Sequence, residues 1–485
     1  MIQIFKAIIK NILRPFIRPF FARLRRIIRE EMEMAFRQEI KNLYSLLSPI
    51  EEEHQNHYHK INENSYNISK INSRRMISNK MNNVLFIGDN TDVLNFGCRA
   101  TSAALAEILG HSVAIIDRIY RKEITHLFIN TPLCDDWYLY LKTVKEYDIE
   151  CYEYLLSRIK KNNAVILNGE GSFIFQSPPR LDLHNYLVIL HACIETGTPF
   201  YILNAMFSAF ADEPINEDLI NQAMPILEQA EIFAARDIHS QQIISQYNDK
   251  VNVTFIPDAL FSWYSLYNEN RNILNDMLHN SRLVLPFIDH DPFQHNMDFS
   301  HPYALFSGNS FAAKHPDQAR NSFTKLVLAL KNQAEKLGIS LYLIETCSGD
   351  AVIRQVALEI KIPIIPVNTN IYFAGKILGN ALCYVSGRYH PSILASMGGT
   401  PCVFMGSNSH KTLSIQTVLG IPPEEQELFP AIPDEDLVPH IVSSFEKKIL
   451  NQNREQVRNI CKTNASIVQD KISMLFKTNF LANFF

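Results

Sequence analysis

From residue 83 onward, the hydrophobic residues of this chain fall in short apolar runs separated by helix-length amphipathic stretches. In the first half, the runs that predict buried strands are 83–88, 112–116, 164–167, 199–204 and 232–235. The helical patterns between them cover 100–109, 186–196 and 219–229. Such alternation is typical of a parallel sheet covered on both faces, so we expect one doubly wound α/β domain over residues 83–270.

A second series of the same kind begins near residue 302. Its predicted strands are 303–306, 340–345, 362–366, 381–386 and 401–405, and its predicted helices are 318–337, 350–360, 371–378 and 391–397. We therefore expect a second doubly wound domain over residues 280–436, followed by helices over residues 437–485 that pack across both domains. Two Rossmann-like domains of this kind face each other across a cleft lined by the carboxyl ends of their strands, where such folds bind ligands.

The first 29 residues follow a different pattern, in which apolar pairs recur every four residues between eight basic residues. On a helix this spacing separates an apolar face from a cationic face, although Pro15 and Pro19 kink it. No apolar run approaches the roughly 20 residues of a membrane span. We expect residues 1–50 to lie on an anionic membrane surface, or else to dock on a partner protein. Residues 51–82 are polar, which predicts a flexible tether.

Composition excludes several classes of protein. The chain has 485 residues and a net charge of -4, which argues against nucleic-acid binding. Its length predicts two domains. Eight cysteines are scattered without a CxxC pair, which favours buried free thiols in a reducing cytoplasm over disulfides or zinc. Three histidines of the tether, 54, 57 and 59, are expected to be solvated, so the sequence predicts neither a metal nor a cofactor.

Polar residues collect where the predicted strands end. Asn90 and Asn95 follow the first strand, in a loop whose backbone amides could meet a ligand or could simply form the turn. Asn168 and Glu170 lie in "NGEGS" (168–172), after a later strand. Glu170 could act as a general base or bind a sugar hydroxyl, whereas Ser172 could make the same segment a simple helix cap.

Charged residues follow three further strands. Arg236 and Asp258 each come directly after a strand, where they could contact a ligand or form a local salt bridge or cap. In "SGRYHP" (386–391), Pro391 suits the first position of a helix, which places Arg388 and His390 just ahead of that helix. An arginine beside a helix N-terminus suits phosphate or carboxylate, and a histidine beside that anion could donate a proton near neutral pH.

These motifs, in this order, resemble those of the polysaccharide pyruvyltransferase family. The matching pieces, within residues 83–415, are "NFGCRAT", "NGEGS", "AARDIHS", "IPDALF", "FSGNS", "SGRYHPSILASMGGTPCVF" and "SNSHKT". The resemblance implies two domains arranged as in GT-B glycosyltransferases. It also implies transfer of pyruvate from phosphoenolpyruvate to two hydroxyls of a sugar, in a surface polysaccharide or its lipid-linked precursor. That reaction forms a ketal and releases phosphate.

Ketal formation needs an acid, a base and a cationic site for phosphate. The resemblance implies that His390 is the acid, that Arg388 clamps phosphate or carboxylate, and that Arg236 is a second anion-binding residue. Glu170 or Asp258 would be the base. Further candidates for substrate binding are Lys411, Lys314, Ser386, Ser310, Asn90, Asn95 and Asn168.

Two departures from the family pattern affect these assignments. Pro391 stands where a small residue is expected, and Glu170 stands where a glycine is usual. A nucleotide-sugar glycosyltransferase is the main alternative, because residues 289–291 spell the metal-binding triplet DHD. A non-catalytic scaffold of a glycan assembly complex is a third possibility. In each case we expect the protein at the inner face of the cytoplasmic membrane, held by its basic N-terminal segment.

Overall fold

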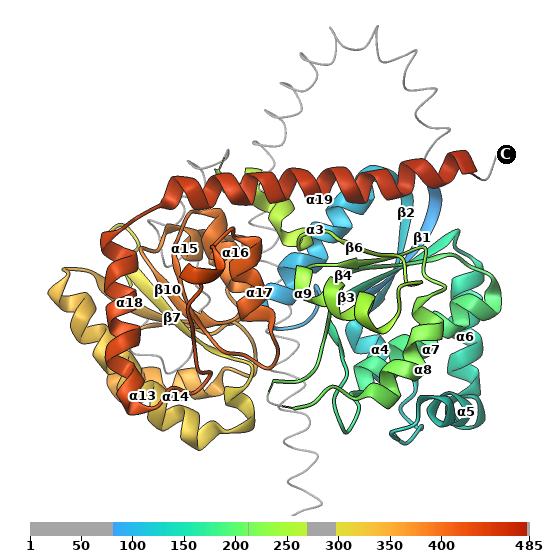
Figure 1. The fold of residues 1–485 in the computed structure, drawn as a ribbon, viewed down its shortest axis with the longest axis horizontal. Coiled ribbons are helices and arrows are strands. Elements are labelled where there is room, and N and C mark those ends of the chain that lie inside the picture. Colours follow the sequence, from blue (N-terminus) through green and yellow to red (C-terminus); the bar gives the residue numbers. More distant parts are fainter. Residues whose placement is uncertain (1–80, 212, 269–296, 483–485) are drawn as a thin grey trace, which may run out of the picture. The chain divides into compact units, whose positions relative to one another are not determined.

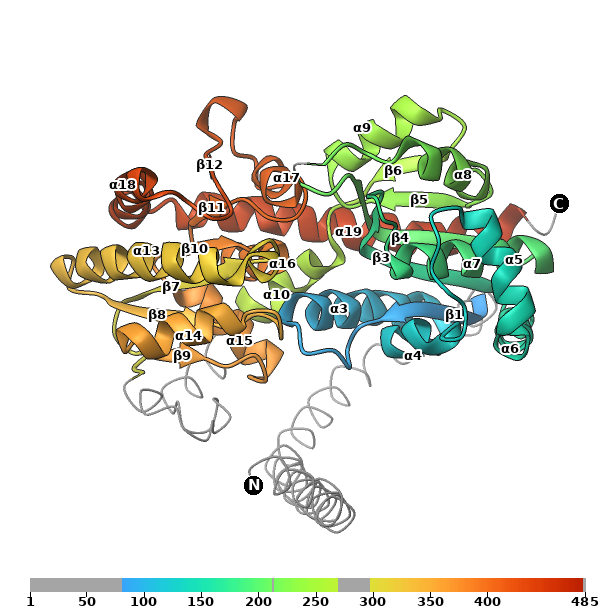
Figure 2. The same cartoon turned by 90° about the horizontal axis from the view of Figure 1, so that it is seen from below.

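The computed structural model describes residues 81–211, 213–268 and 297–482, with side chains in the last helix as far as Phe476. The basic segment 1–50, nearly all of the tether 51–82 and the triplet 289–291 lie outside these residues. Figure 1 and Figure 2 show two sheets, each flanked by helices. Both sheets have six parallel strands, which confirms the predicted α/β fold with two Rossmann-like domains.

The first sheet has the strand order β2-β1-β3-β4-β5-β6. Its strands are β1 (Met81–Asp89), β2 (Val113–Tyr120), β3 (Ala164–Ile174), β4 (Phe200–Ser208), β5 (Ile232–Ala235) and β6 (Val253–Phe255). Its helices are α3 (Phe96–Ser112), α4 (Arg121–Leu127), α5 (Trp137–Tyr147), α6 (Ile149–Lys160), α7 (Leu181–Thr196), α8 (Glu217–Leu227) and α9 (Ile238–Tyr247). A 3-10 helix, η3 (Ala259–Trp263), and α10 (Tyr264–Asn268) follow the last strand.

The second sheet has the order β12-β11-β10-β7-β8-β9. Its strands are β7 (Tyr303–Asn309), β8 (Ser340–Ile344), β9 (Ile364–Ile365), β10 (Tyr384–Gly387), β11 (Cys402–Met405) and β12 (Leu428–Phe429). The main helices are α13 (Pro316–Lys336), α14 (Ala351–Ile360), α15 (Ile371–Asn380), α16 (Tyr389–Met397), α17 (Lys411–Val418), α18 (Val438–Leu450) and α19 (Arg454–Ala482).

Each sheet reverses its strand order at one point, between β1 and β3 in the first sheet and between β7 and β10 in the second. Open α/β sheets bind ligands at the carboxyl ends of the strands at such reversals. Asn90 follows β1 and Glu170 lies in β3, whereas Ser310 follows β7 and Arg388 follows β10. The topology therefore brings the predicted site residues to the position where this fold binds ligands.

Three local features differ from the sequence predictions. Strand β3 does not end at residue 167 but continues through the "NGEGS" segment, with an irregular register against β4 between Glu170 and Phe173. Helices α4, α5 and α6 fill an interval for which the sequence pattern gave no prediction. Helix α16 begins at Tyr389, so His390 lies inside its first turn rather than ahead of it.

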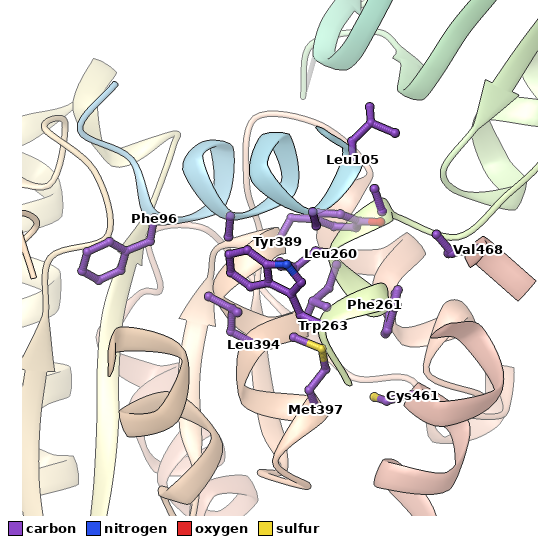
Figure 3. Close-up of a cluster of buried hydrophobic side chains, with 14 of the residues drawn as sticks. Phe96, Leu105, Leu260, Phe261, Trp263, Tyr389, Leu394, Met397, Cys461 and Val468 are labelled. Atoms are coloured by element: carbon purple, nitrogen blue, oxygen red, sulfur yellow. The ribbon is translucent and has the colours of Figure 1, made fainter. Parts of the chain in front are cut away.

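A hydrophobic cluster shared by elements of both sheets lies next to the "SGRYHP" segment. Figure 3 shows its members from four elements: α3, η3, α16 and α19. The labelled residues are Phe96, Leu105, Leu260, Phe261, Trp263, Tyr389, Leu394, Met397, Cys461 and Val468. Tyr389 is 3% exposed, and it therefore anchors the start of α16 in this cluster through its ring.

Helix α19 contacts both halves of the protein (Figure 1). At its start, Arg454 donates hydrogen bonds to the backbone carbonyls of Gly379, Ala381 and Gly398 in the second half. Further along, the ring of Phe476 lies 5.4 Å from that of Tyr201 in β4 of the first sheet. The helix therefore connects the two sheets through side-chain contacts.

Two further sequence expectations can be compared with the described residues. All eight cysteines are free thiols, as predicted, and four of them, 193, 383, 402 and 461, are buried. None of the described helices is both long enough and apolar enough to cross a bilayer.

Candidate active site

Eight of the predicted site residues line a single cleft of about 370 Å³. Those from the first half of the chain are Asn90, Asn95, Glu170 and Arg236. Those from the second half are Ser310, Arg388, His390 and Lys411. The remaining four predicted residues, Asn168, Asp258, Ser386 and Lys314, are not part of the cleft lining. The first three lie directly behind residues that are, whereas Lys314 lies apart from them.

Arg388 is held at the carboxyl end of β10, immediately before α16. Its guanidinium forms an ion pair with the buried carboxylate of Asp350 and donates to Ser310 Oγ at 3.0 Å. Its backbone N–H donates to Ser386 Oγ at 2.9 Å. Ser386 is buried and therefore supports the turn that carries Arg388 rather than the cleft surface.

The imidazole of His390 is fixed by residues of the first half of the chain. Its Nε2 atom lies 3.2 Å from Asp258 Oδ2 and 3.1 Å from Arg236 Nη1. Near the other ring nitrogen, a Cβ atom added to Gly97 would come within 2.4 Å of Nδ1. The ring can occupy this position only because residue 97 has no side chain.

Asp258 lies behind the imidazole and has no exposed surface. Burial alone would raise the pKa of its carboxyl, but His390 and Arg236 outweigh burial and lower the pKa to about 2. The carboxylate also accepts a hydrogen bond from Thr101 Oγ1 at 2.7 Å. This placement suits a group that orients the histidine, because a base for a sugar hydroxyl must be within hydrogen-bond reach of it.

Arg236 follows β5 and is 2% exposed. Its guanidinium carbon lies 4.3 Å from the centre of the Tyr389 ring, and Nη1 lies 3.4 Å from Asp258 Oδ2. A guanidinium over an aromatic face is a favourable contact. Because Tyr389 stands between Arg388 and His390 in the chain, this contact helps to fix the whole "SGRYHP" turn.

Glu170 is the carboxylate that the first half of the chain contributes to the cleft wall. Its φ of 39° is in the left-handed region, which costs a non-glycine residue about 1 kcal/mol or more. Its Oε1 atom accepts from Asn90 Nδ2 at 2.5 Å, and from Ser102 Oγ and Asn168 Nδ2 at 3.2 Å. Asn168 thus supports Glu170 from beneath the cleft. The positive φ also explains why a glycine suits this position.

Lys411 begins α17 and reaches the cleft through its side chain. The amine donates to Asn408 Oδ1 at 2.6 Å and to Ser310 Oγ at 3.1 Å. Burial lowers its pKa, and the charges of Arg388 and Arg236 lower it further, to about 7. Lys411 and Arg388 therefore meet at one hydroxyl, that of Ser310.

Lys314 lies apart from these residues. Its ammonium is 3.9 Å from Glu213 Oε1 and 3.4 Å from the centre of the Phe210 ring. About half of its side chain is exposed, and it does not line the cleft. The sequence placed it near the site because the motif "SGNS" precedes it, but the turn η5 (Ala312–Lys314) directs it elsewhere.

Sequence reasoning missed two arginines of the cleft, Arg121 and Arg180. Both form ion pairs with the carboxylate of Asp182, and Arg180 also donates to the backbone carbonyl of Gly171 at 3.0 Å. Arg121 directly follows β2, so its position was a signal of the same kind as that of Arg236. Arg180 lies ahead of α7, and no pattern in the sequence places it beside the glycine-rich segment.

The cleft combines four arginines, a lysine, a histidine and a carboxylate on surfaces contributed by both sheets. Such a site can bind a multivalent anion and transfer protons to or from it. No group of three or more potential metal ligands occurs among the described residues. The fold and this cleft define a protein with two Rossmann-like domains of the GT-B type and a candidate site for an anionic ligand.

The chain belongs to the polysaccharide pyruvyl transferase family, whose model matches residues 95–409, and it is therefore a transferase. None of the curated proteins matches its sequence. Many solved structures are similar to it at the level of the fold alone, and two of them illustrate this. UDP-GlcNAc 2-epimerase from Neisseria meningitidis, bound to UDP-GlcNAc, is 10% identical with a TM-score of 0.47; the match covers 80% of this chain and 100% of that chain. The N-terminal domain of Candida albicans trehalose-6-phosphate phosphatase is 8% identical with a TM-score of 0.49, covering 83% and 97%.

Proposed function

We propose that this protein transfers pyruvate from phosphoenolpyruvate to two hydroxyls of a sugar, forming a ketal and releasing phosphate. The acceptor would be a bacterial surface polysaccharide or its lipid-linked precursor. Membership of the family supports this reaction class. The observation that carries the proposal is the convergence of Arg388, Lys411 and His390 on one cleft, since the reaction needs cations for the donor and an acid beside them.

The donor carries a phosphate and a carboxylate, and the cleft offers cations for both. Arg388 and Lys411 meet at Ser310 Oγ, so a single phosphate can touch both of them. Arg236, from the first half of the chain, lies beside His390 and lines the same cleft, where it can meet the donor's second anionic group. The arginines present planar sets of N–H donors, which match phosphate and carboxylate oxygens.

His390 would protonate the methylene carbon of the donor, which leaves positive charge at the neighbouring carbon. Asp258 would hold the imidazole in place, because the carboxylate lies 3.2 Å from Nε2 and stays ionised. Of the two carboxylates considered as the base, Glu170 is the one that lines the cleft. We therefore assign Glu170 to the sugar hydroxyl and Asp258 to the histidine.

A nucleotide-sugar glycosyltransferase remains the second candidate. The triplet 289–291 that suggests it lies outside the described residues. Under the pyruvyltransferase proposal, full activity is expected to survive prolonged treatment with a chelator, because cationic side chains already meet the donor's charge. Activity that is lost and then restored by magnesium or manganese would favour the glycosyltransferase.

The direct test supplies the full-length protein with phosphoenolpyruvate or with nucleotide sugars, each in the presence of a panel of lipid-linked glycans. Release of phosphate that depends on both phosphoenolpyruvate and a glycan is the expected result. Release of free nucleotide from a sugar donor would replace the proposal with its alternative. If neither product appears with any glycan, the scaffold hypothesis gains support.

A further inference from the structure

If phosphoenolpyruvate is the donor, as proposed above, ketal formation requires the delivery of two protons. One proton converts the donor's methylene carbon to a methyl group. The other must reach the phosphate oxygen as its bond to the donor carbon breaks, so that phosphate leaves as the monohydrogen ion. In the overall balance, these two protons are made up by the two that the sugar hydroxyls lose when the ketal forms. The assignments above supply a single acid, His390, and a second proton donor is needed.

The charges of the cleft point to one side chain for this role. Each of its four arginines has a carboxylate partner: Asp182 for Arg121 and Arg180, Asp258 for Arg236, and Asp350 for Arg388. Lys411, in contrast, makes no ion pair with any residue that the structure describes. Within the part of the chain that the structure describes, the amine has two hydrogen-bond acceptors, the neutral oxygens of Ser310 and Asn408.

Most of the charged groups that act on the pKa of the Lys411 amine are positive. Arg388 at the start of α16, Arg236 at the end of β5 and Arg180 at the start of α7 line the same cleft and lower the pKa of Lys411, whereas Cys98 of α3 raises it. The adjacent His410 directs Nε2 to Asp237, at 3.1 Å, and not toward the amine.

An uncompensated ammonium among three guanidinium groups is unfavourable. Burial and these charges accordingly lower the pKa of Lys411 to about 7, so at neutral pH much of the amine is unprotonated before the donor binds.

We propose that Lys411 takes up a proton when the anionic donor binds and then delivers it to the departing phosphate. In the delivery step the bond between the donor carbon and the phosphate oxygen breaks, and its electron pair stays on that oxygen. The oxygen takes a proton from Lys411 Nζ, which keeps the electron pair of the broken N–H bond. The neutral amine is restored when phosphate leaves, ready for the next donor.

Geometry supports the pairing of this amine with the phosphate. Lys411 Nζ and Arg388 Nη1 lie 3.1 Å and 3.0 Å from the same oxygen, Ser310 Oγ. An anion that binds beside the Ser310 hydroxyl, or takes over its hydrogen bonds, therefore contacts both Lys411 and Arg388. Arg388 keeps its charge at all working pH values and can only clamp the phosphate, whereas a lysine amine can give up its proton.

Proton uptake on donor binding can be measured by titration calorimetry in buffers of different ionisation enthalpy. At pH 8 an amine with a pKa near 7 is mostly neutral, so phosphoenolpyruvate should bind with uptake of about nine-tenths of a proton by Lys411. At pH 6 the amine is already charged, and the uptake should fall to about one-tenth. Lys411→Arg should abolish this contribution, because arginine stays protonated, whereas the surface variant Lys325→Met should retain it.

Turnover separates proton delivery from anion binding. Lys411→Arg should keep donor affinity within about tenfold, yet reduce acceptor-dependent phosphate release by about 10²–10⁴-fold. Lys411→Met should lose both. The inference is overturned if Lys411→Arg turns over within threefold of the wild type, or if it takes up as many protons as the wild type. If phosphoenolpyruvate does not bind to the wild type at all, the proposed function itself fails, which is a separate result.

Discussion

At the scale of single residues, the site depends on a glycine as much as on its charged groups. Gly97 lies in the first turn of α3, and a Cβ atom there would come within 2.5 Å of both Nδ1 and Cβ of His390. Contacts this short force the imidazole or its helix to move. The position of the ring against Asp258 is therefore set partly by the absence of a side chain at residue 97.

Gly97→Ala should consequently displace His390 and lower turnover by at least about tenfold, since small misplacements of catalytic groups are costly. The matched control is Gly110→Ala in the same helix, where an added Cβ would have no atom within 4 Å. That variant should keep full activity and gain about 0.5–1 kcal/mol of stability from its helix position. Equal activity of the two variants, with both folded, would remove the steric argument.

Substitutions of Arg388 and of His390 should impair different properties, donor binding for Arg388 and turnover for His390. His390→Gln keeps a polar side chain but removes the acid, so donor binding should persist while turnover drops by about 10²–10⁴-fold. Arg388→Lys should weaken donor binding by up to about 1.5–3 kcal/mol, because a point charge does not reproduce the planar set of donors. The lysine still pairs with the buried Asp350, which Arg388→Ala would leave unpaired.

Calorimetry with phosphoenolpyruvate and assays of phosphate release measure these two effects separately. Near-normal turnover of a folded His390→Gln protein would reduce the histidine to a structural role.

At the scale of elements, the sequence predicts most strands of both sheets because the buried strands are short apolar runs bounded by polar turns. Strand β5 was predicted with its observed bounds, residues 232–235. The failure at β3 has a physical cause. Glycine and glutamate are poor strand residues, so the pattern ended the strand at residue 167, whereas pairing with β4 extends it to Ile174.

The site residues also differ in how they could be predicted: some have a local sequence motif, whereas others are placed only by tertiary contacts. Arg388, His390 and Arg236 were predictable because each lies at a strand end with a local motif. The ion pair of Arg121 with Asp182 joins residues 61 positions apart, and no local pattern carries such a contact, although Arg121 does lie at a strand end. Arg180 pairs with the nearby Asp182, but nothing local places this arginine in the cleft. For the same reason the sequence could not decide whether Asp258 or Glu170 is the base. Only the structure shows that Asp258 lies behind His390 and that Glu170 lines the cleft.

Helix α19 provides a test of stability that is independent of catalysis. Phe476→Ala removes a ring that is 2% exposed and packs against Tyr201, which should lower the free energy of unfolding by about 3 kcal/mol. The exposed substitution Ser466→Ala on the same helix should change it by less than about 0.5 kcal/mol. Denaturant unfolding measures both values. An unchanged midpoint for Phe476→Ala would mean that this end of the helix contributes little to the stability of the first sheet.

At the scale of the whole molecule, the basic N-terminal segment is proposed to hold the enzyme at the inner face of the membrane. Deleting residues 1–48 should move the protein into the soluble fraction, and high salt should do so partly, because it screens the attraction to anionic lipid. Sedimentation with vesicles containing anionic lipid measures the effect. Continued sedimentation of the truncated protein in high salt would contradict membrane attachment through this segment.

Pyruvyl transfer is tested most directly by the mass of the glycan after incubation with phosphoenolpyruvate and the full-length protein. The glycan should gain the mass of a pyruvate ketal, with one phosphate released per ketal. The same incubation with His390→Gln should yield little or none of this product. A wild-type protein that binds phosphoenolpyruvate but leaves the mass of every glycan unchanged would contradict the proposed pyruvyl transfer.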